Sequence, residues 1–74
     1  MMNKEIMIAK ALGEYDGKMA MIREASEEMF RNLPVNVAGE TDAEALRDLN
    51  NWVERKKAAA ADALVEAIKK ADKM

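Results

Sequence analysis

Cysteine and histidine are absent from this 74-residue chain, which also has one proline, three glycines and one each of tryptophan, tyrosine and phenylalanine. Without cysteine and histidine, the sequence excludes zinc fingers, thiol redox pairs, disulfide scaffolds and Ser–His catalytic triads. The longest segment without a charged residue, 32–39, has eight residues and is too short to cross a bilayer. Glu5 follows the first residues too closely for a secretory signal. We therefore expect a cytoplasmic protein without a membrane partner.

Charge is nearly balanced, with 12 lysines and arginines against 14 aspartates and glutamates, a net charge of −2. This balance provides no broad positive field, which argues against nucleic acid as a partner. Half of the residues are apolar and 35% are charged, a composition typical of a folded chain rather than a disordered one. At this length we expect residues 1–74 to form a single domain.

The only proline divides the chain. Pro34 lacks an amide hydrogen and disfavours the helical conformation at Leu33, so a helix that precedes it should end near residue 32. Thr41 and Glu44 have the spacing of a capping box, in which Thr41 would be the N-cap of the next helix. The sequence predicts a helix over about 3–32, a loop over 33–41 and a helix over about 42–73.

Each predicted helix carries an apolar line at spacings of three and four residues, the pattern of a helix that packs along another helix. In the first helix the line is Ile8, Leu12, Tyr15, Met19, Ile22, Ser26, Met29 and Leu33. In the second it is Leu46, Leu49, Val53, Ala60, Leu64, Ile68 and Ala71, and Lys57 interrupts it. Because the connection is short, we expect an all-α fold, an antiparallel helical hairpin.

Two helices cannot enclose a core, so apolar residues outside the two lines need a partner. Another copy of the chain is the simplest partner, and we expect the hairpin to assemble into a homo-oligomeric helical bundle. The residues expected at the interface are Met21, Phe30, Trp52, Ala59 and Ala63.

Catalysis finds little support in the sequence. Glu24, Glu27 and Glu28 could form a carboxylate pair, but di-metal bundles use Glu-x-x-His units and this chain has no histidine. Ser26 has no base to activate it. Gly13 and Gly17 lie inside a predicted helix without a preceding strand, so they do not form a phosphate loop. We expect a non-enzymatic protein without a cofactor or a bound metal.

The basic run Arg55, Lys56 and Lys57 is the candidate ligand site. Lys57 continues the apolar line and is followed by four alanines, whose small side chains let a ligand or a neighbouring helix approach. Trp52, one turn before Lys56, could stack on a base or anchor an interface. We predict that these four residues bind an anionic ligand between subunits. The alternative is a set of solvated side chains, with the Lys57 stem along the bundle and its amine in water.

Several of these residues also resemble a known family. The segment Lys10-Ala11-Leu12-Gly13, together with Trp52, Lys57, Leu64 and Lys69, is similar to small phage proteins of the anti-CBASS cyclic-nucleotide sponge family. Members are short helical proteins that form compact oligomers and sequester cyclic di- and trinucleotide signals without cleaving them. The resemblance implies a phage-encoded immune-evasion protein that sequesters a cyclic nucleotide or inhibits a host defence protein.

Two other functions fit the same pattern. A helical-hairpin dimer could act as a protein or RNA interaction module, with the basic run duplicated across a two-fold axis. The chain could also be an assembly subunit without a ligand. Near-neutral charge weakens the RNA version, since lysine and arginine contacts dominate phosphate binding.

Overall fold

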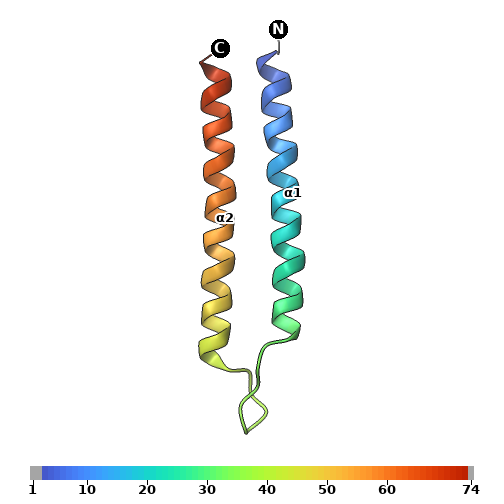
Figure 1. The fold of residues 1–74 in the computed structure, drawn as a ribbon, viewed down its shortest axis with the longest axis vertical. Helices are drawn as coiled ribbons and strands as arrows, with labels where there is room; N and C mark the ends of the chain where they lie inside the picture. Colours follow the sequence, from blue (N-terminus) through green and yellow to red (C-terminus); the bar gives the residue numbers. More distant parts are fainter. Residues whose placement is uncertain (1–2, 74) are drawn as a thin grey trace.

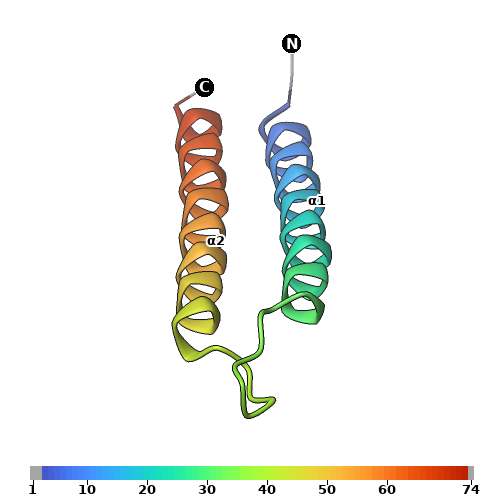
Figure 2. The ribbon, with the colours of Figure 1, turned by 60° about the horizontal axis from the view of Figure 1, so that its bottom comes forward.

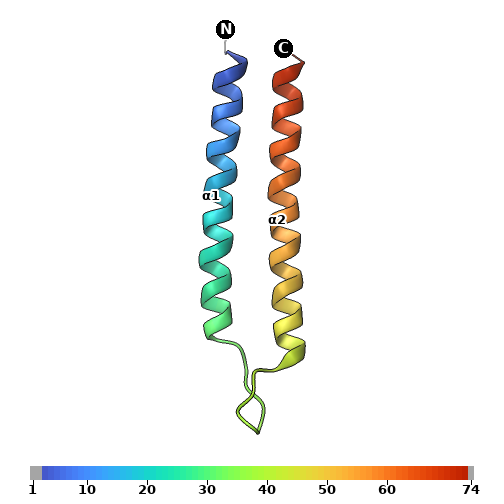
Figure 3. The same cartoon turned by 180° about the vertical axis from the view of Figure 1, so that it is seen from behind.

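The fold is a hairpin of two long antiparallel helices, described by the computed structural model for residues 3–73. Helix α1 spans Lys4–Arg31 and helix α2 spans Ala43–Asp72. Figures 1 and 3 show the helices side by side from opposite directions, with both termini at one end and the connection at the other. The predicted break at Pro34, the two helices and their antiparallel packing are confirmed.

Local hydrogen bonds explain where α1 begins and ends. The Asn3 side chain is the N-cap and accepts from the backbone N–H of Glu5 at 2.8 Å. At the other end, the Asn32 side-chain amide donates to the Glu28 carbonyl oxygen at 2.8 Å, so a carbonyl of the last turn has a partner. Arg31 places a positive charge at the negative end of the helix dipole.

The predicted cap of α2 is wrong by one residue. Asp42, not Thr41, is the N-cap, and its carboxylate accepts from the backbone N–H of Ala45 at 2.9 Å. Thr41 instead forms an antiparallel bridge with Val35 in the connection, which holds it outside the helix. Asp and Thr both cap helices well, and the bridge decides which of the two does so here.

The connection is a small closed loop that projects beyond the helix ends (Figure 2). One side chain organises it, because Asn36 Oδ1 accepts from the backbone N–H groups of both Ala38 and Glu40. Gly39 has a φ of +81°, which glycine adopts without the steric cost that other residues incur. A hydrogen bond of 2.9 Å from the Asp42 N–H to the Pro34 carbonyl oxygen closes the base of the loop.

The most deeply buried side chains of the contact between the helices are mainly small. Buried residues are Ala11 and Ser26 in α1 and Leu49, Ala60 and Ala71 in α2. The Ser26 hydroxyl donates to the Arg23 carbonyl oxygen in its own helix at 2.9 Å, which satisfies a polar group inside the contact. The predicted line of α2 is confirmed, since its members are buried or half-buried, apart from the interruption at Lys57.

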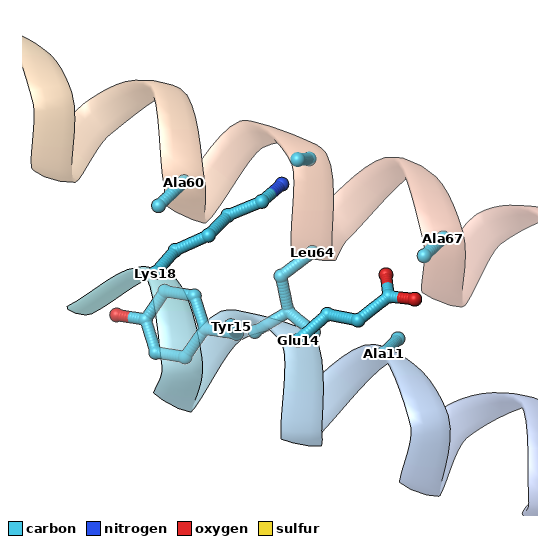
Figure 4. A pocket seen from close by; sticks show the side chains of 8 residues that line it. Ala11, Glu14, Tyr15, Lys18, Ala60, Leu64 and Ala67 are labelled. Carbon is cyan, nitrogen blue, oxygen red and sulfur yellow. The ribbon is translucent and has the colours of Figure 1, made fainter. Parts of the chain in front are cut away.

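The predicted line of α1 is wrong at two positions. Leu12 and Met29 are exposed, and Ala11 is buried in place of Leu12. Ala11 and Ala60 both lie in the contact (Figure 4). Small residues let helix axes approach closely, and α1 is turned so that Leu12 lies beside the contact.

No large side chain among the described residues is fully buried, and several large apolar residues are exposed. They are Ile6, Leu12, Met21, Met29, Phe30, Val35, Val37 and Val65. Neither helix formed by residues 3–73 has an apolar stretch of the length and hydropathy needed to cross a membrane.

Candidate binding groove

One side of the hairpin carries a groove along the line where α1 and α2 meet. We call this side the groove face. The middle of the groove has a floor of small residues, with Ala11 from α1 and Ala60, Ala63 and Ala67 from α2. Figure 4 shows the Glu14 and Lys18 side chains extending from α1 toward α2, where Ala60 and Ala67 lie. The long charged side chains of this middle part therefore come from α1. Three of the four lining positions of α2 are alanines, and the fourth is Leu64.

Two open notches adjoin this middle part. The loop-proximal notch has a volume of about 310 Å³ and lies between Lys18 and Lys56. Its remaining lining residues are Met21, Ile22, Ala59 and Ala60. The terminal notch has a volume of about 210 Å³ and is lined by Met7, Lys10, Ala11, Glu14, Ala67 and Lys70. Both notches combine an apolar surface with lysines at the edge.

The groove face is positively charged although the chain as a whole is not. Its lining includes four lysines, Lys10, Lys18, Lys56 and Lys70, against one glutamate, Glu14. The net charge of the whole chain is −2. The two ion pairs described for residues 3–73, Lys4–Asp72 and Lys69–Glu66, lie outside this lining. The positive charge of the groove is therefore local and suits an anionic group.

Two of the four predicted ligand residues come together. Lys56 Nζ lies 5.8 Å from the centroid of the Trp52 ring, one helical turn away. A lysine over an indole face is a cation–π contact. Trp52 is half-buried within the hairpin, so part of this residue stays accessible. Because Lys56 also lines the loop-proximal notch, its contact with Trp52 lies at the edge of that notch.

The other two predicted ligand residues point elsewhere. Successive residues of a helix are separated by about 100°, so Arg55, Lys56 and Lys57 fan out around α2. Arg55 lines a shallow depression on the outer surface together with Asp48, Asn51 and Glu54. Lys57 is exposed and lies in line with Leu64 and Ile68, on the side of α2 away from the groove face. Within one chain, the basic run does not converge on a single ligand.

The predicted interface residues also divide between two sides. Met21, with 71% of its surface exposed, lines the loop-proximal notch with Ala59, and Ala63 belongs to the adjoining floor. Phe30 lies nine residues after Met21, which is two and a half turns, and therefore faces the opposite side of α1. One flat interface cannot contain all of them.

We call the side opposite the groove face the apolar flank. Leu12, Phe30 and Val65 lie there and are 46%, 42% and 48% exposed. Leu12 and Phe30 are eighteen residues apart, or five full turns, and so lie on one line of α1. The half-buried residues Met19 and Ile68 border the same flank.

The acidic residues do not form a metal centre. Glu24, Glu27 and Glu28 line an open depression on α1 with Arg31 and Asn32. Across residues 3–73, no group of three or more carboxylates is arranged to hold a metal ion. Arg31 lies among these exposed carboxylates, which is typical of a solvated surface.

Comparison with protein-family models, with curated proteins and with solved structures found no match. The similarity to cyclic-nucleotide sponges therefore stays a prediction.

Sequence reasoning missed Lys10, Lys18 and Lys70 as groove residues. The spacing of these lysines in the sequence could have indicated their position. Lys10, Glu14 and Lys18 follow each other at four-residue steps directly beside the apolar line, and Ala59, Ala63 and Ala67 do the same in α2.

Proposed function

We propose that this chain is a non-enzymatic binding protein whose working form is a homo-oligomer of helical hairpins. In this arrangement the apolar flank is covered by a second copy and the groove face stays open for an anionic partner. The two surfaces differ in chemistry, as expected if one binds a second copy and the other binds an anion. The apolar flank presents large aliphatic and aromatic side chains, and the groove face presents lysines around an alanine floor.

The exposed area of the single chain supports the oligomer. A compact monomer of 8.3 kDa exposes about 4,600 Å². This chain exposes 5,877 Å², which is about 1,300 Å² more than that expectation. Stable protein interfaces bury about 800 Å² on each partner, so the excess is large enough to supply one. A two-fold contact through the apolar flank would use the same patch on both copies.

Sedimentation velocity at 10–100 µM tests this arrangement. We expect the wild-type chain to sediment as a dimer or larger, and Leu12→Glu or Val65→Glu to dissociate it. Ile6→Glu is the matched control, because Ile6 is also an exposed aliphatic residue of α1 but faces away from the flank. A monomeric wild-type chain, or dissociation by Ile6→Glu to the same extent, would overturn the proposal.

A cyclic nucleotide is the second candidate partner, and the contact between Lys56 and Trp52 favours it. A base could stack on the exposed part of the indole while a phosphate meets the Lys56 ammonium group. Such a protein would sequester its ligand, in keeping with the phage-encoded immune-evasion role that the sequence resemblance implies. A thermal-shift screen with cyclic di- and trinucleotides tests it. A ligand at 100 times its dissociation constant should stabilise the fold by about 2.7 kcal/mol.

A further inference from the structure

The positions of the lysines along the groove indicate the shape of the anionic partner that the groove can bind. Lys10 and Lys70 border the terminal notch, and Lys18 and Lys56 border the loop-proximal notch. Along α1, Lys10 and Met21 are eleven residues apart, which corresponds to about 16 Å of helix. A mononucleotide or a small cyclic nucleotide in one notch would reach only the lysines of that notch. An elongated partner would meet all four.

The surface between the notches encloses only about 20 Å³, and half of its lining residues are alanines. The floor is built from Ala60, Ala63 and Ala67, which lie on one line of α2 and leave room for a third helix axis to come close. Glu14 and Lys18 extend over this floor and both are exposed, so a docked helix would have to displace them to its edges. A third helix in this position would complete a three-helix bundle with α1 and α2.

We propose that the groove face binds one amphipathic helix of an acidic partner protein. Two apolar side chains of that helix, about three turns apart, occupy the two notches. Carboxylates beside them meet Lys10 and Lys70 at one notch and Lys18 and Lys56 at the other. An apolar seam with acidic edges is the complement of an alanine floor with basic edges, and it is unlike the groove face itself. This inference rests on the proposed function, because it requires that a second copy leaves the groove face open.

The probe is a designed helical peptide with leucines at positions i, i+4, i+7 and i+11 and glutamates on both sides of that seam. Its matched control has lysines in place of the glutamates. We expect the full chain to bind the fluorescently labelled acidic peptide with micromolar affinity, measured by anisotropy, and the basic peptide at least tenfold more weakly. Affinity for the acidic peptide should fall as salt is added. Equal binding of both peptides, or binding of neither, would overturn the inference.

Variants of the chain locate the binding. Lys18→Glu combined with Lys56→Glu should weaken the acidic peptide at least tenfold. Lys57→Glu is the control for the Lys56→Glu part of this variant, because it makes the same single charge change at the next residue of α2, and it should alter affinity less than twofold. Ala63→Leu fills the floor without adding charge, and it should also weaken the peptide. Loss of binding with Lys57→Glu instead of the double variant would overturn the inference.

Sedimentation of the same variants separates this inference from the proposed function. If Ala63→Leu or the double lysine variant dissociates the oligomer, the groove face is the interface between copies, and both proposals fail. If the oligomer stays intact and the acidic peptide does not bind, only the helix inference fails. A cyclic dinucleotide or an RNA hairpin that binds the same lysines more tightly than the peptide would also overturn it.

Discussion

The carboxylate of Asp42 accepts a hydrogen bond of 2.9 Å from the backbone N–H of Ala45, and this bond begins α2. Asp42 also donates its own backbone N–H to the Pro34 carbonyl oxygen at 2.9 Å. One residue thus caps the helix with its side chain and closes the loop with its main chain. The start of α2 and the shape of the loop depend on the same position.

Replacement of Asp42 tests the cap. Asp42→Ala should lower the free energy of unfolding by about 1 kcal/mol, since loss of an N-cap acceptor typically costs that much. Thr41→Ala is the matched control and should cost less, because the Thr41 side chain does not cap α2. Urea denaturation followed by circular dichroism, at one fixed protein concentration, measures both. A larger loss of unfolding free energy for Thr41→Ala than for Asp42→Ala would show that Thr41 is the N-cap.

The loop provides a second test. Asn36→Ala removes the acceptor for the N–H groups of Ala38 and Glu40 and should lower the free energy of unfolding by about 1 kcal/mol. Asn36→Asp keeps an acceptor oxygen at the same place and should cost less. Gly39→Ala should cost about 1–2 kcal/mol because of the positive φ at that residue. The same denaturation experiment measures all three, and an unchanged stability for Asn36→Ala would contradict the role given to its side chain.

Much of this fold could be predicted from sequence because its main determinants are local. Pro34 and the three- and four-residue spacing of apolar positions define where the helices lie and that they pair. The rotation of α1 could not be read in the same way. Ala11 and Leu12 are both apolar and adjacent, and which of them is buried depends on how closely α2 approaches.

The candidate site was harder to predict for a related reason. Lys56 and Lys57 are neighbours in the sequence, but a helix directs them to different sides, and only a rotation known to within a fraction of a turn tells which one borders the groove. The sequence favoured Lys57 because it continued the apolar line. In the structure Lys56 borders the groove.

The exposed glycines of α1 offer a prediction about partners. A Cβ atom added at Gly13 or Gly17 would meet no other atom within 4 Å, so neither glycine is required by packing within the chain. Gly13→Ala and Gly17→Ala should each raise the free energy of unfolding by about 1 kcal/mol, the difference in helix propensity. Thermal and urea denaturation measure the gain. A loss of stability that grows with protein concentration would instead show that these glycines lie against another copy.

Substitutions of the two neighbouring lysines give the last prediction. Lys56→Ala removes the ammonium group that lies 5.8 Å from the Trp52 ring centroid, so the emission of Trp52 should change in intensity or wavelength. Lys57→Ala should leave that emission unchanged, because Lys57 points to another side of α2. Both variants replace lysine with a better helix former at an exposed position, so neither should lower the free energy of unfolding by more than about 0.5 kcal/mol. Steady-state fluorescence and urea denaturation, performed on the same samples, measure the two effects separately.

A change in Trp52 emission with Lys57→Ala and none with Lys56→Ala would contradict the placement of these side chains. Equal changes with both would show that the emission reports the net charge of α2 and not the contact.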